Sequence, residues 1–288
     1  MAIRRIEIED FLVFKDNIAI DFCHGVNILI GGNGTGKTTL MKTAYRWVVS
    51  ARPVNAERDV FFAPEQVRIF LDTNKTHNVI NAVYFPEKDI LEHARGLLPF
   101  IEQKPSGFDQ IYRDVLVRAQ DIPTKSQTET QKTIGEMISK IIGGAVYWEP
   151  SEGVYYTIQT DGMRIPFSHE ASGYKKLGFL GLLVASGQLE KDSVLFWDEP
   201  DNSLNPELVP VLVSILLELS KSGVQIFLAT HDYNLARSFD VRENKGLPVL
   251  YHNFHKAAGN GQIVCQSSSE YTKLTDNLLE IANENLFE

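Results

Sequence analysis

The chain contains few cysteines, no long apolar run and no excess of positive charge. Its two cysteines, Cys23 and Cys265, lie far apart and lack the paired spacing of a metal site, so we interpret them as free thiols. This pattern excludes a small secreted domain held together by disulfides. No apolar stretch approaches the roughly 20 residues of a membrane-spanning helix, and residues 1–7 lack the apolar centre of a signal peptide. We therefore expect a cytosolic protein with no membrane partner.

Charge and composition argue against an overall attraction to polyanions and against disorder. The formal net charge is −9 at pH 7, which gives the chain no overall attraction to DNA or to an anionic membrane. Hydrophobic residues make up 43% and charged residues 23% of the sequence, and these fractions argue against disorder. A chain of 288 residues has room for one large α/β domain, with or without a smaller lobe.

The stretch Gly-Gly-Asn-Gly-Thr-Gly-Lys-Thr at residues 31–38 matches the phosphate-loop pattern G-x-x-x-x-G-K-[ST] in full. It follows an apolar run, residues 26–30, that is typical of a buried strand, and it precedes a helical pattern over residues 39–50. Glycines let backbone N–H groups turn toward an anion, and the N-terminus of the helix adds a partial positive charge. We predict that the phosphates of a nucleotide are bound by Gly31, Gly32, Asn33, Gly34, Thr35, Gly36, Lys37, Thr38 and Thr39.

Two adjacent acids end a second apolar run, in the segment Val-Leu-Phe-Trp-Asp-Glu-Pro at residues 194–200. Carboxylates at the C-terminal edge of a buried strand meet a phosphate loop across a parallel sheet. We expect Thr38 and Asp198 to hold Mg²⁺, and Glu199 to polarise the attacking water. Lys37 is expected to reach the β- and γ-phosphates.

A histidine follows the third apolar run, in residues 225–232. A neutral imidazole at this place can hydrogen-bond the γ-phosphate or orient the attacking water. His231 is therefore the third catalytic candidate, after Lys37 and Glu199.

Aromatic residues lie next to two of these motifs. Phe11 and Phe14 come after the first predicted strand, where they either belong to the core or stack on the adenine. Trp197 directly precedes the acidic pair, and we expect it to be buried in the core, with one end of its indole toward the neighbouring strand that contains Phe227.

Hydrophobic periodicity predicts secondary structure along the whole chain. Strands alternate with helices near both ends, which predicts a parallel core sheet, and the first two strands suggest an antiparallel layer beside it. The predicted strands are residues 3–9, 17–22, 26–30, 66–71, 78–85, 145–148, 154–159, 163–166, 193–197, 225–229, 249–254 and 262–266. The predicted helices are residues 39–50, a stretch that begins near residue 90, and residues 109–119, 128–142, 172–187, 206–220 and 271–285.

Taken in order, these motifs resemble those of the ATP-binding-cassette (ABC) type of ATPase head. The strands before the phosphate loop look like the branch that contains SMC, RecF and overcoming-lysogenisation-defect proteins, rather than transporter subunits. In that superfamily a phosphate loop, a Ser-Gly signature, two acids, a D-loop and a switch histidine follow one another, and here they fall on residues 31–38, 171–176, 198–199, 202–205 and 231.

The resemblance implies a fold, an activity and two cofactors. The fold is an α/β P-loop NTPase core of ABC-ATPase type, with N-terminal antiparallel strands and an inserted helical and β sub-lobe. A single domain would span residues 1–288, with the sub-lobe over residues 51–168. The activity is that of a stand-alone bacterial AAA-family ATPase, with ATP and Mg²⁺ as ligands.

The resemblance also implies a homodimer through the ATP sites. Ser172 and Gly173 of one subunit would contact the γ-phosphate held by Lys37 of the other, and the helix N-terminus at Ser172 suits an anion. The signature differs from the pattern of transporters, since Ala-Ser-Gly-Tyr-Lys stands in place of Leu-Ser-Gly-Gly-Gln. The D-loop also differs, because Asn205 stands where an aspartate is common.

The glutamine of the Q-loop has no clear counterpart in the sequence. Gln66 precedes a predicted strand instead of following one. After the predicted strand at residues 78–85 the chain offers Glu87 and Lys88 instead.

Our leading hypothesis for the role of ATP turnover is the regulation of a separate effector, a nuclease or a toxin. Heads of the overcoming-lysogenisation-defect type serve in bacterial anti-phage or mobile-element systems, and the segment after His231 is too short for a nuclease domain of usual size. The alternative is a DNA-maintenance clamp like RecF, in which ATP closes two heads on duplex DNA. Transporter energisation is disfavoured by the signature and by the N-terminal strands. The DNA-clamp hypothesis needs a local basic face, for which the candidates are Arg52, Arg58, Lys125, Lys175 and Lys176.

Overall fold

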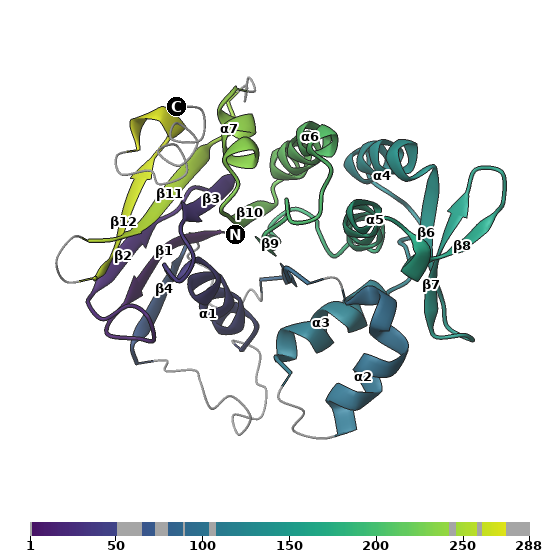
Figure 1. Ribbon diagram of the computed structural model, residues 1–288, viewed down its shortest axis with the longest axis horizontal. Coiled ribbons are helices and arrows are strands. Elements are labelled where there is room, and N and C mark those ends of the chain that lie inside the picture. The colour runs from purple at the N-terminus through teal and green to yellow at the C-terminus, as the bar shows by residue number, and fades with distance from the viewer. Residues whose placement is uncertain are drawn as a thin grey trace, which may run out of the picture.

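Three β-sheets, with helices between and around them, make up the described part of the chain (Figure 1). The structure is a computed structural model that describes residues 2–50, 65–72, 80–88, 90–103, 108–241, 246–257 and 261–274. The core sheet has the strand order β12-β11-β3-β10-β9-β5. A three-stranded sheet lies beside it, and a second three-stranded sheet lies at the opposite end of the molecule (Figure 1). None of the helices in these ranges combines the length and the apolarity needed to cross a bilayer.

The core sheet consists of five parallel strands and one antiparallel edge strand, β12. Every residue of β3, β5, β9 and β10 is buried, because other elements cover both faces of the sheet. The strands are β3 (Val26–Gly31), β5 (Ala82–Phe85), β9 (Val194–Asp198), β10 (Gln225–Thr230), β11 (Val249–Lys256) and β12 (Ile263–Ser268). The predicted α/β core with a parallel sheet is confirmed.

Neighbouring side chains of the core strands point into two different clusters of buried residues. Phe196 and Phe227 pack on the side of α1, with their rings stacked at a centroid distance of 4.9 Å. Trp197 points to the other side, where its indole stacks on the ring of Phe85 at 4.3 Å. The predicted burial of Trp197 is confirmed, and its ring partner Phe85 lies on β5, on the other side of β9 from the strand that contains Phe227. Successive residues of a strand face opposite sides, and Phe227 is the register partner of Phe196.

Helices cover both faces of the core sheet. Helix α1 contributes to the cluster that contains Phe196, and helices α3 to α7 contribute to the cluster that contains Trp197. Helix α7 was missing from the predictions, because its short apolar pattern gives only three buried residues. The helices are α1 (Lys37–Ser50), α2 (Ala94–Gln103), α3 (Gln110–Ala119), α4 (Glu129–Ile142), α5 (Ser172–Ala185), α6 (Val209–Lys221) and α7 (Tyr233–Val241). Short 3₁₀ turns lie at η1 (Leu91–His93), η2 (Phe167–His169), η3 (Pro206–Leu208) and η4 (Tyr271–Lys273).

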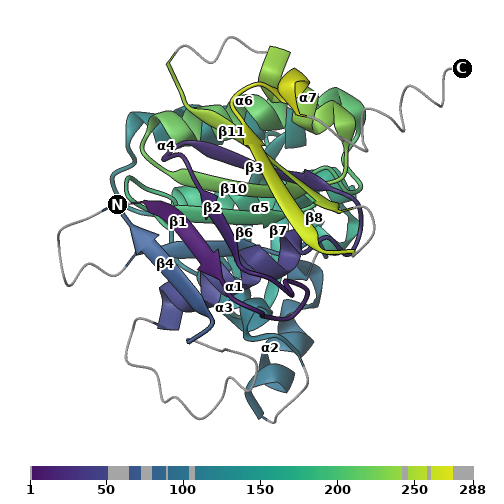
Figure 2. The same cartoon turned by 90° about the vertical axis from the view of Figure 1, so that its left-hand side faces the viewer.

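The N-terminal antiparallel layer is the sheet β2-β1-β4, and Figure 2 views the molecule from its side. Gln225 at the start of β10 ties this sheet to the core sheet: its Oε1 accepts from the N–H of Ile3 at 2.7 Å, and its Nε2 donates to the Ile3 carbonyl at 2.8 Å. Phe11 and Phe14 are buried in the cluster that this sheet shares with the core sheet, which favours the core interpretation of both rings. The strands are β1 (Ile3–Ile8), β2 (Ile18–Asp21) and β4 (Val67–Leu71).

The middle of the chain forms the helices α2 to α4 and the third sheet. Helix α4 begins at a capping box between Thr128 and Gln131, and it ends at Gly143, whose φ of 72° is left-handed. Strands β4 and β5 also fall within residues 51–168, yet they pair with β1 and β9. The lobe boundary stays a prediction, and a start after Phe85 agrees better with these pairings. The third sheet contains β6 (Gly144–Glu149), β7 (Val154–Gln159) and β8 (Arg164–Pro166).

The predicted helix at residues 271–285 differs from the described structure where the two can be compared. Residues 271–273 form a 3₁₀ turn, and Leu274 is extended with a ψ of 125°, so no α-helix begins at residue 271. Residues 275–285 lie outside the described residues, as do residues 78–79 of a predicted strand and the positions of Arg52 and Arg58.

Replacement of Trp197 by alanine tests the packing of β9. Trp197 is 0% exposed and stacks on Phe85, so Trp197→Ala should lower the free energy of unfolding by about 3–5 kcal/mol. Urea unfolding followed by far-UV circular dichroism measures this loss. Tyr147→Ala removes a ring that is 50% exposed and serves as the matched control, with an expected loss below about 1 kcal/mol. Equal losses in the two variants would contradict the placement of β9 inside the sheet.

A buried histidine lies in the middle of β11, where it is the register partner of Leu29 on β3. His252 on β11 is 0% exposed, with Nδ1 2.8 Å from Oγ of Ser267 and Nε2 3.4 Å from Oδ1 of Asn27. Burial lowers the pKa of His252 to about 3, because a charged imidazolium would be poorly solvated there. The native state therefore keeps this side chain neutral at a pH where the unfolded chain binds a proton.

This difference predicts a loss of stability on acidification. Between the unfolded pKa of about 6.5 and the folded value of about 3, the unfolded state binds more protons, so the free energy of unfolding falls as the pH falls. At pH 5 the expected loss from this group is about 2 kcal/mol relative to pH 7. His252→Asn should reduce the pH slope of urea unfolding relative to the wild type. An unchanged slope in His252→Asn would contradict the neutral buried state.

Candidate functional site

The phosphate loop lies between β3 and α1 and requires glycine at several positions. Gly31, Gly34 and Gly36 have φ values of 140°, 74° and 93°, which other residues rarely adopt. A Cβ on Gly36 would lie 2.6 Å from the ring of Phe14, and a Cβ on Gly31 would lie 2.1 Å from the carbonyl oxygen of Phe254. The loop is therefore held tightly between the N-terminal layer and β11, with its backbone free to turn around an anion.

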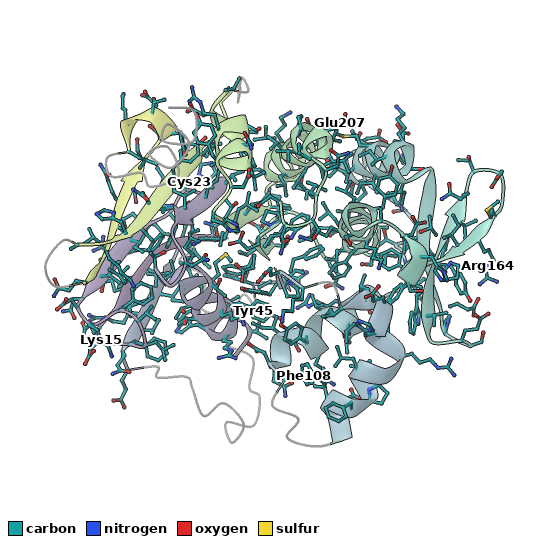
Figure 3. The ribbon with its side chains drawn as sticks, viewed as in Figure 1. Lys15, Cys23, Tyr45, Phe108, Arg164 and Glu207 are labelled. Atoms are coloured by element: carbon teal, nitrogen blue, oxygen red, sulfur yellow. The ribbon has the colours of Figure 1, made fainter. Side chains whose placement is uncertain are left out.

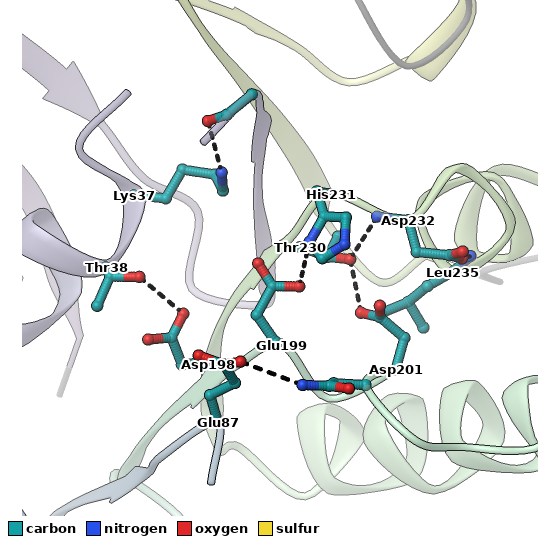
Figure 4. A network of polar contacts seen from close by, with 12 residues as sticks. Lys37, Thr38, Glu87, Asp198, Glu199, Asp201, Thr230, His231, Asp232 and Leu235 are labelled. Atoms are coloured by element: carbon teal, nitrogen blue, oxygen red, sulfur yellow. Dashed lines mark hydrogen bonds and ion pairs between the residues drawn. The ribbon is translucent and has the colours of Figure 1, made fainter. Parts of the chain in front are cut away.

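Lys37 lies near the end of the phosphate loop, and its side chain contacts the loop backbone. Its Nζ donates to the carbonyls of Gly31 at 2.7 Å and Gly32 at 3.0 Å, and only 6% of the residue is exposed (Figure 4). Burial lowers the pKa of Lys37, while Asp198 and Glu199 oppose that shift. A phosphate group near this ammonium would find a cation that is already placed and partly desolvated.

Thr38 and Asp198 meet at the edge of the sheet. Oγ1 of Thr38 lies 3.0 Å from Oδ1 of Asp198, and the hydroxyl of Tyr84 lies 3.1 Å from Oδ2 (Figure 4 shows the first contact). Burial raises the pKa of Asp198, and both hydroxyls act in the opposite direction. Burial and the adjacent Asp198 likewise raise the pKa of Tyr84.

The oxygens of Thr38 and Asp198 fit a magnesium ion. Mg²⁺ prefers hydroxyl, carboxylate, phosphate and water oxygens, and proteins commonly hold it with one or two carboxylates plus the phosphates of a substrate. Within the described ranges, no group of three His, Cys, Asp or Glu side chains could hold a metal ion. A donor set of one hydroxyl and one carboxylate suits a metal that also binds the phosphates of a nucleotide.

Glu199 and His231 form a close pair across two neighbouring strand ends. Nδ1 of His231 lies 2.6 Å from Oε2 of Glu199, and the imidazole side chain is 56% exposed (Figure 4). The contact with Glu199 raises the pKa of His231, whereas burial raises the pKa of Glu199. Glu199 also has a φ of 49°, a strained conformation of the kind that clusters at functional sites. The pair can orient and polarise a water molecule.

Hydrogen bonds between the strand ends and the D-loop support this pair. The hydroxyl of Thr230 donates to Oδ1 of Asp201 at 2.6 Å and accepts from the N–H of Asp232 at 2.9 Å. Nδ2 of Asn202 donates to Oε1 of Glu87 at 3.1 Å (Figure 4). Glu87 lies two residues after the end of β5, in the place where the sequence offered no glutamine.

Lys176 on α5 binds backbone carbonyls of the loop that follows β9. This lysine is 5% exposed, and its Nζ donates to the carbonyls of Glu199, at 3.0 Å, and Asn202. The neighbouring Lys175 is 8% exposed and pairs with Glu92. Sequence reasoning missed these roles and those of Tyr84, Asp201 and Thr230. For Lys175, Lys176, Asp201 and Thr230 the only signal was their nearness in sequence to the motifs, whereas Tyr84 lies far from every motif and gave no signal.

Twelve of the fourteen predicted site residues come together at one edge of the core sheet, and two do not. Lys37, Thr38, Asp198, Glu199 and His231 lie at or beside the ends of β3, β9 and β10, together with the rest of the loop, including Thr35 and Thr39.

Ser172 and Gly173 stand apart from this group. No hydrogen bond among the described residues joins either of them to the phosphate loop. Ser172 is exposed at the start of α5, and Gly173 is buried against the side chain of Leu204.

Replacement of Lys176 by methionine tests the backbone contact. Methionine keeps an aliphatic side chain but leaves two carbonyls without their donor, so Lys176→Met should lower the free energy of unfolding by about 1–3 kcal/mol. Urea unfolding measures the change. Lys221→Met removes an exposed amine paired with Glu218 and is the matched control, with an expected change below about 0.5 kcal/mol. A stable Lys176→Met variant would show that the loop does not depend on this lysine.

Curated relatives resemble short parts of the chain. The energy-coupling factor transporter ATP-binding protein EcfA of Methanothermobacter thermautotrophicus is 28% identical over 99 residues, 33% of this chain and 30% of that protein. The arginine transport ATP-binding protein ArtP of Haemophilus influenzae is 35% identical over 82 residues, 28% of this chain and 31% of that protein. The chain thus spans about a third of the length of the curated relatives it matches.

Solved structures resemble nearly the whole chain. The head of an SMC protein bound to the C-winged helix domain of ScpA matches with a TM-score of 0.60 at 15% identity, over 95% of this chain and 100% of that one. An ATP-binding cassette of an ABC transporter matches with a TM-score of 0.55 at 18% identity, over 100% and 99% of the two chains. At these identities the likeness concerns the fold, which is that of ABC cassettes and SMC heads.

A family model described as "AAA domain, putative AbiEii toxin, Type IV TA system" matches residues 48–237, about two thirds of the chain. The match begins within α1 and does not include the phosphate loop, so the loop supports nucleotide binding independently of the match. The chain therefore belongs to this AAA-domain family and has the fold of a P-loop NTPase of ATP-binding-cassette type.

Proposed function

We propose that this protein hydrolyses ATP in a Mg²⁺-dependent reaction, dimerises on ATP, and uses that cycle to control a separate effector. The observation that carries the proposal is the meeting of Lys37, Thr38, Asp198, Glu199 and His231 at one sheet edge. Each of these side chains has the chemistry that phosphoryl transfer to water needs.

In this proposal the residues of one chain divide the work of hydrolysis. The loop backbone and Lys37 bind the phosphates, and Thr38 and Asp198 would hold Mg²⁺, which neutralises charge on the phosphate oxygens when bound. Glu199 accepts the proton of the attacking water, and His231 holds the Glu199 carboxylate in place through Nδ1. The raised pKa of Glu199 suits a general base, because it lies closer to neutral pH than the pKa of a carboxylate in water.

The proposed dimer would complete the site with a second copy of the chain. Ser172 lies exposed at the N-terminus of α5, a helix of 14 residues, so its backbone could approach an anion outside its own subunit. Gly173 packs against Leu204 of the D-loop. The preceding residue, Ser203, has a left-handed backbone with a φ of 61°. A γ-phosphate contact by the partner subunit would therefore act on the loop that carries Glu199.

The proposed effector is a nuclease or a toxin in a bacterial anti-phage or mobile-element system. The family description, with its toxin and type IV toxin–antitoxin terms, supports this context. The contacts of the lysines disfavour the DNA-clamp alternative, because Lys175 and Lys176 are buried and engaged within the chain. Lys125 is exposed, but Arg52 and Arg58 lie outside the described residues. Salt-sensitive, ATP-dependent binding to duplex DNA would favour the clamp instead.

Replacement of Glu199 by glutamine tests the reaction and the dimer together. Glutamine keeps the size of the side chain but cannot accept the proton, so Glu199→Gln should bind ATP as tightly as the wild type and lose at least about 100-fold in turnover. Phosphate release and equilibrium binding of a fluorescent nucleotide measure the two quantities. With ATP and Mg²⁺ the variant should also sediment as a dimer in analytical ultracentrifugation, because the bound state persists.

The control variant makes the same charge change elsewhere. Glu207→Gln alters an exposed carboxylate in η3 and should leave turnover and sedimentation as in the wild type. Turnover retained in Glu199→Gln would refute the assignment of Glu199 as the base. A monomer at every nucleotide condition, with turnover abolished, would leave the base in place and refute the composite site.

A further inference from the structure

A buried tyrosine that was not a predicted site residue touches the acid proposed to hold Mg²⁺. Tyr84 lies on β5, next to β9 in the core sheet, and is 1% exposed. Its hydroxyl lies 3.1 Å from Oδ2 of Asp198 and is the donor, because an ionised carboxylate only accepts. The hydroxyl of Thr38 lies 3.0 Å from the other oxygen, Oδ1. Each oxygen of Asp198 is thus held by a different hydroxyl from a different element.

The ring of Tyr84 does not need its hydroxyl in order to pack. It stacks on Phe196 at a centroid distance of 6.3 Å and meets the ring of Tyr45 edge-on at 5.6 Å. A phenylalanine would keep both contacts, and a buried hydroxyl is unfavourable unless it is hydrogen-bonded. The contact with Asp198 is the hydrogen bond that satisfies this hydroxyl.

We propose that Tyr84 is a positioning residue that orients Asp198 for Mg²⁺ by holding Oδ2, which leaves Oδ1 directed toward Thr38 and the phosphate loop. The inference rests on the proposed ATPase function, since it assigns a support to the same metal site. Carboxylates that ligate a metal are themselves hydrogen-bonded, and loss of such a partner typically lowers metal affinity or activity 10- to 100-fold. Tyr84 acts through Asp198, so its effect should appear in metal binding and not in the binding of metal-free nucleotide.

Tyr45 provides a matched control from the same aromatic group. It is 2% exposed, and its ring contacts Tyr84 and Phe196. Its hydroxyl lies 2.9 Å from Oδ2 of Asp114 on α3, not near Asp198, and Figure 3 shows Tyr45 on the side of α1 that faces α3. Removal of this hydroxyl changes the same chemical group in the same cluster without touching the metal ligand.

The experiment compares Tyr84→Phe, Tyr45→Phe and the wild type as full-length proteins. Electron paramagnetic resonance measures the affinity of the protein for Mn²⁺, a substitute for Mg²⁺, in the presence of a non-hydrolysable ATP analogue. A fluorescent nucleotide in EDTA measures binding without metal. We expect the Mn²⁺ affinity to fall 10- to 100-fold in Tyr84→Phe and to stay at the wild-type value in Tyr45→Phe. Nucleotide affinity in EDTA should be the same in all three proteins.

A double-mutant cycle with Asp198→Asn tests whether Tyr84 acts through this carboxylate. Once Asp198→Asn has removed the charge, adding Tyr84→Phe should cause no further loss of Mn²⁺ affinity. An additional loss equal to that in the single variant would overturn the inference.

The remaining outcomes separate this inference from the proposed function. Mn²⁺ affinity within twofold of wild type in Tyr84→Phe would overturn the inference alone. A Tyr84→Phe protein that fails to fold, or that loses nucleotide affinity in EDTA, would also overturn it, because the hydroxyl would then support the fold instead of the metal ligand. A wild type without metal-dependent nucleotide binding would overturn the proposed function and this inference with it.

Discussion

The parallel pairing of β10 between β3 and β9 is the constraint on which the candidate site depends. The register places Thr230 beside Ile30, and Ala229 beside Asp198, so the phosphate loop, the acids and His231 leave the sheet at the same edge. Parallel strands align their carboxyl ends in this way whatever their separation in the sequence. About 160 residues lie between Thr38 and Asp198, yet their side chains meet at 3.0 Å.

The buried carboxylates at this edge require hydrogen-bond donors beside them. Desolvation raises the pKa of Asp198, Glu199 and Asp201, so each carboxylate is less readily ionised than in water. Each of them also has a nearby donor that acts in the opposite direction, and two of those donors are hydroxyls from neighbouring strands, Tyr84 and Thr230. Loss of one of these donors would leave a buried carboxylate poorly compensated.

Helices α3 and α5 contact the elements of the site through charged side chains. Lys176 on α5 binds the backbone after β9, and Lys175 joins the same helix to Glu92 in η1. Asp109 at the start of α3 pairs with Lys42 and Arg46 of α1, the helix that follows the phosphate loop. Movement of either α3 or α5 would thus act directly on an element that carries a candidate site residue, which is the arrangement a nucleotide-driven switch requires.

The sequence by itself determined the phosphate loop, the acidic pair, the histidine and the parallel core, because each depends on local chemistry. Glycines at fixed spacing, apolar runs and a Lys-Thr pair have the same meaning wherever the chain leads. The tertiary structure alone decided the direction of Trp197, the short helix α7, the buried lysines of α5 and the contact of Tyr84 with Asp198. These features depend on which face of a strand or helix meets a segment far away in the chain, and periodicity contains no information about that partner. Helix α7 and the turn at residues 271–273 were missed or misjudged for the related reason that short elements owe their form to packing rather than to their own pattern.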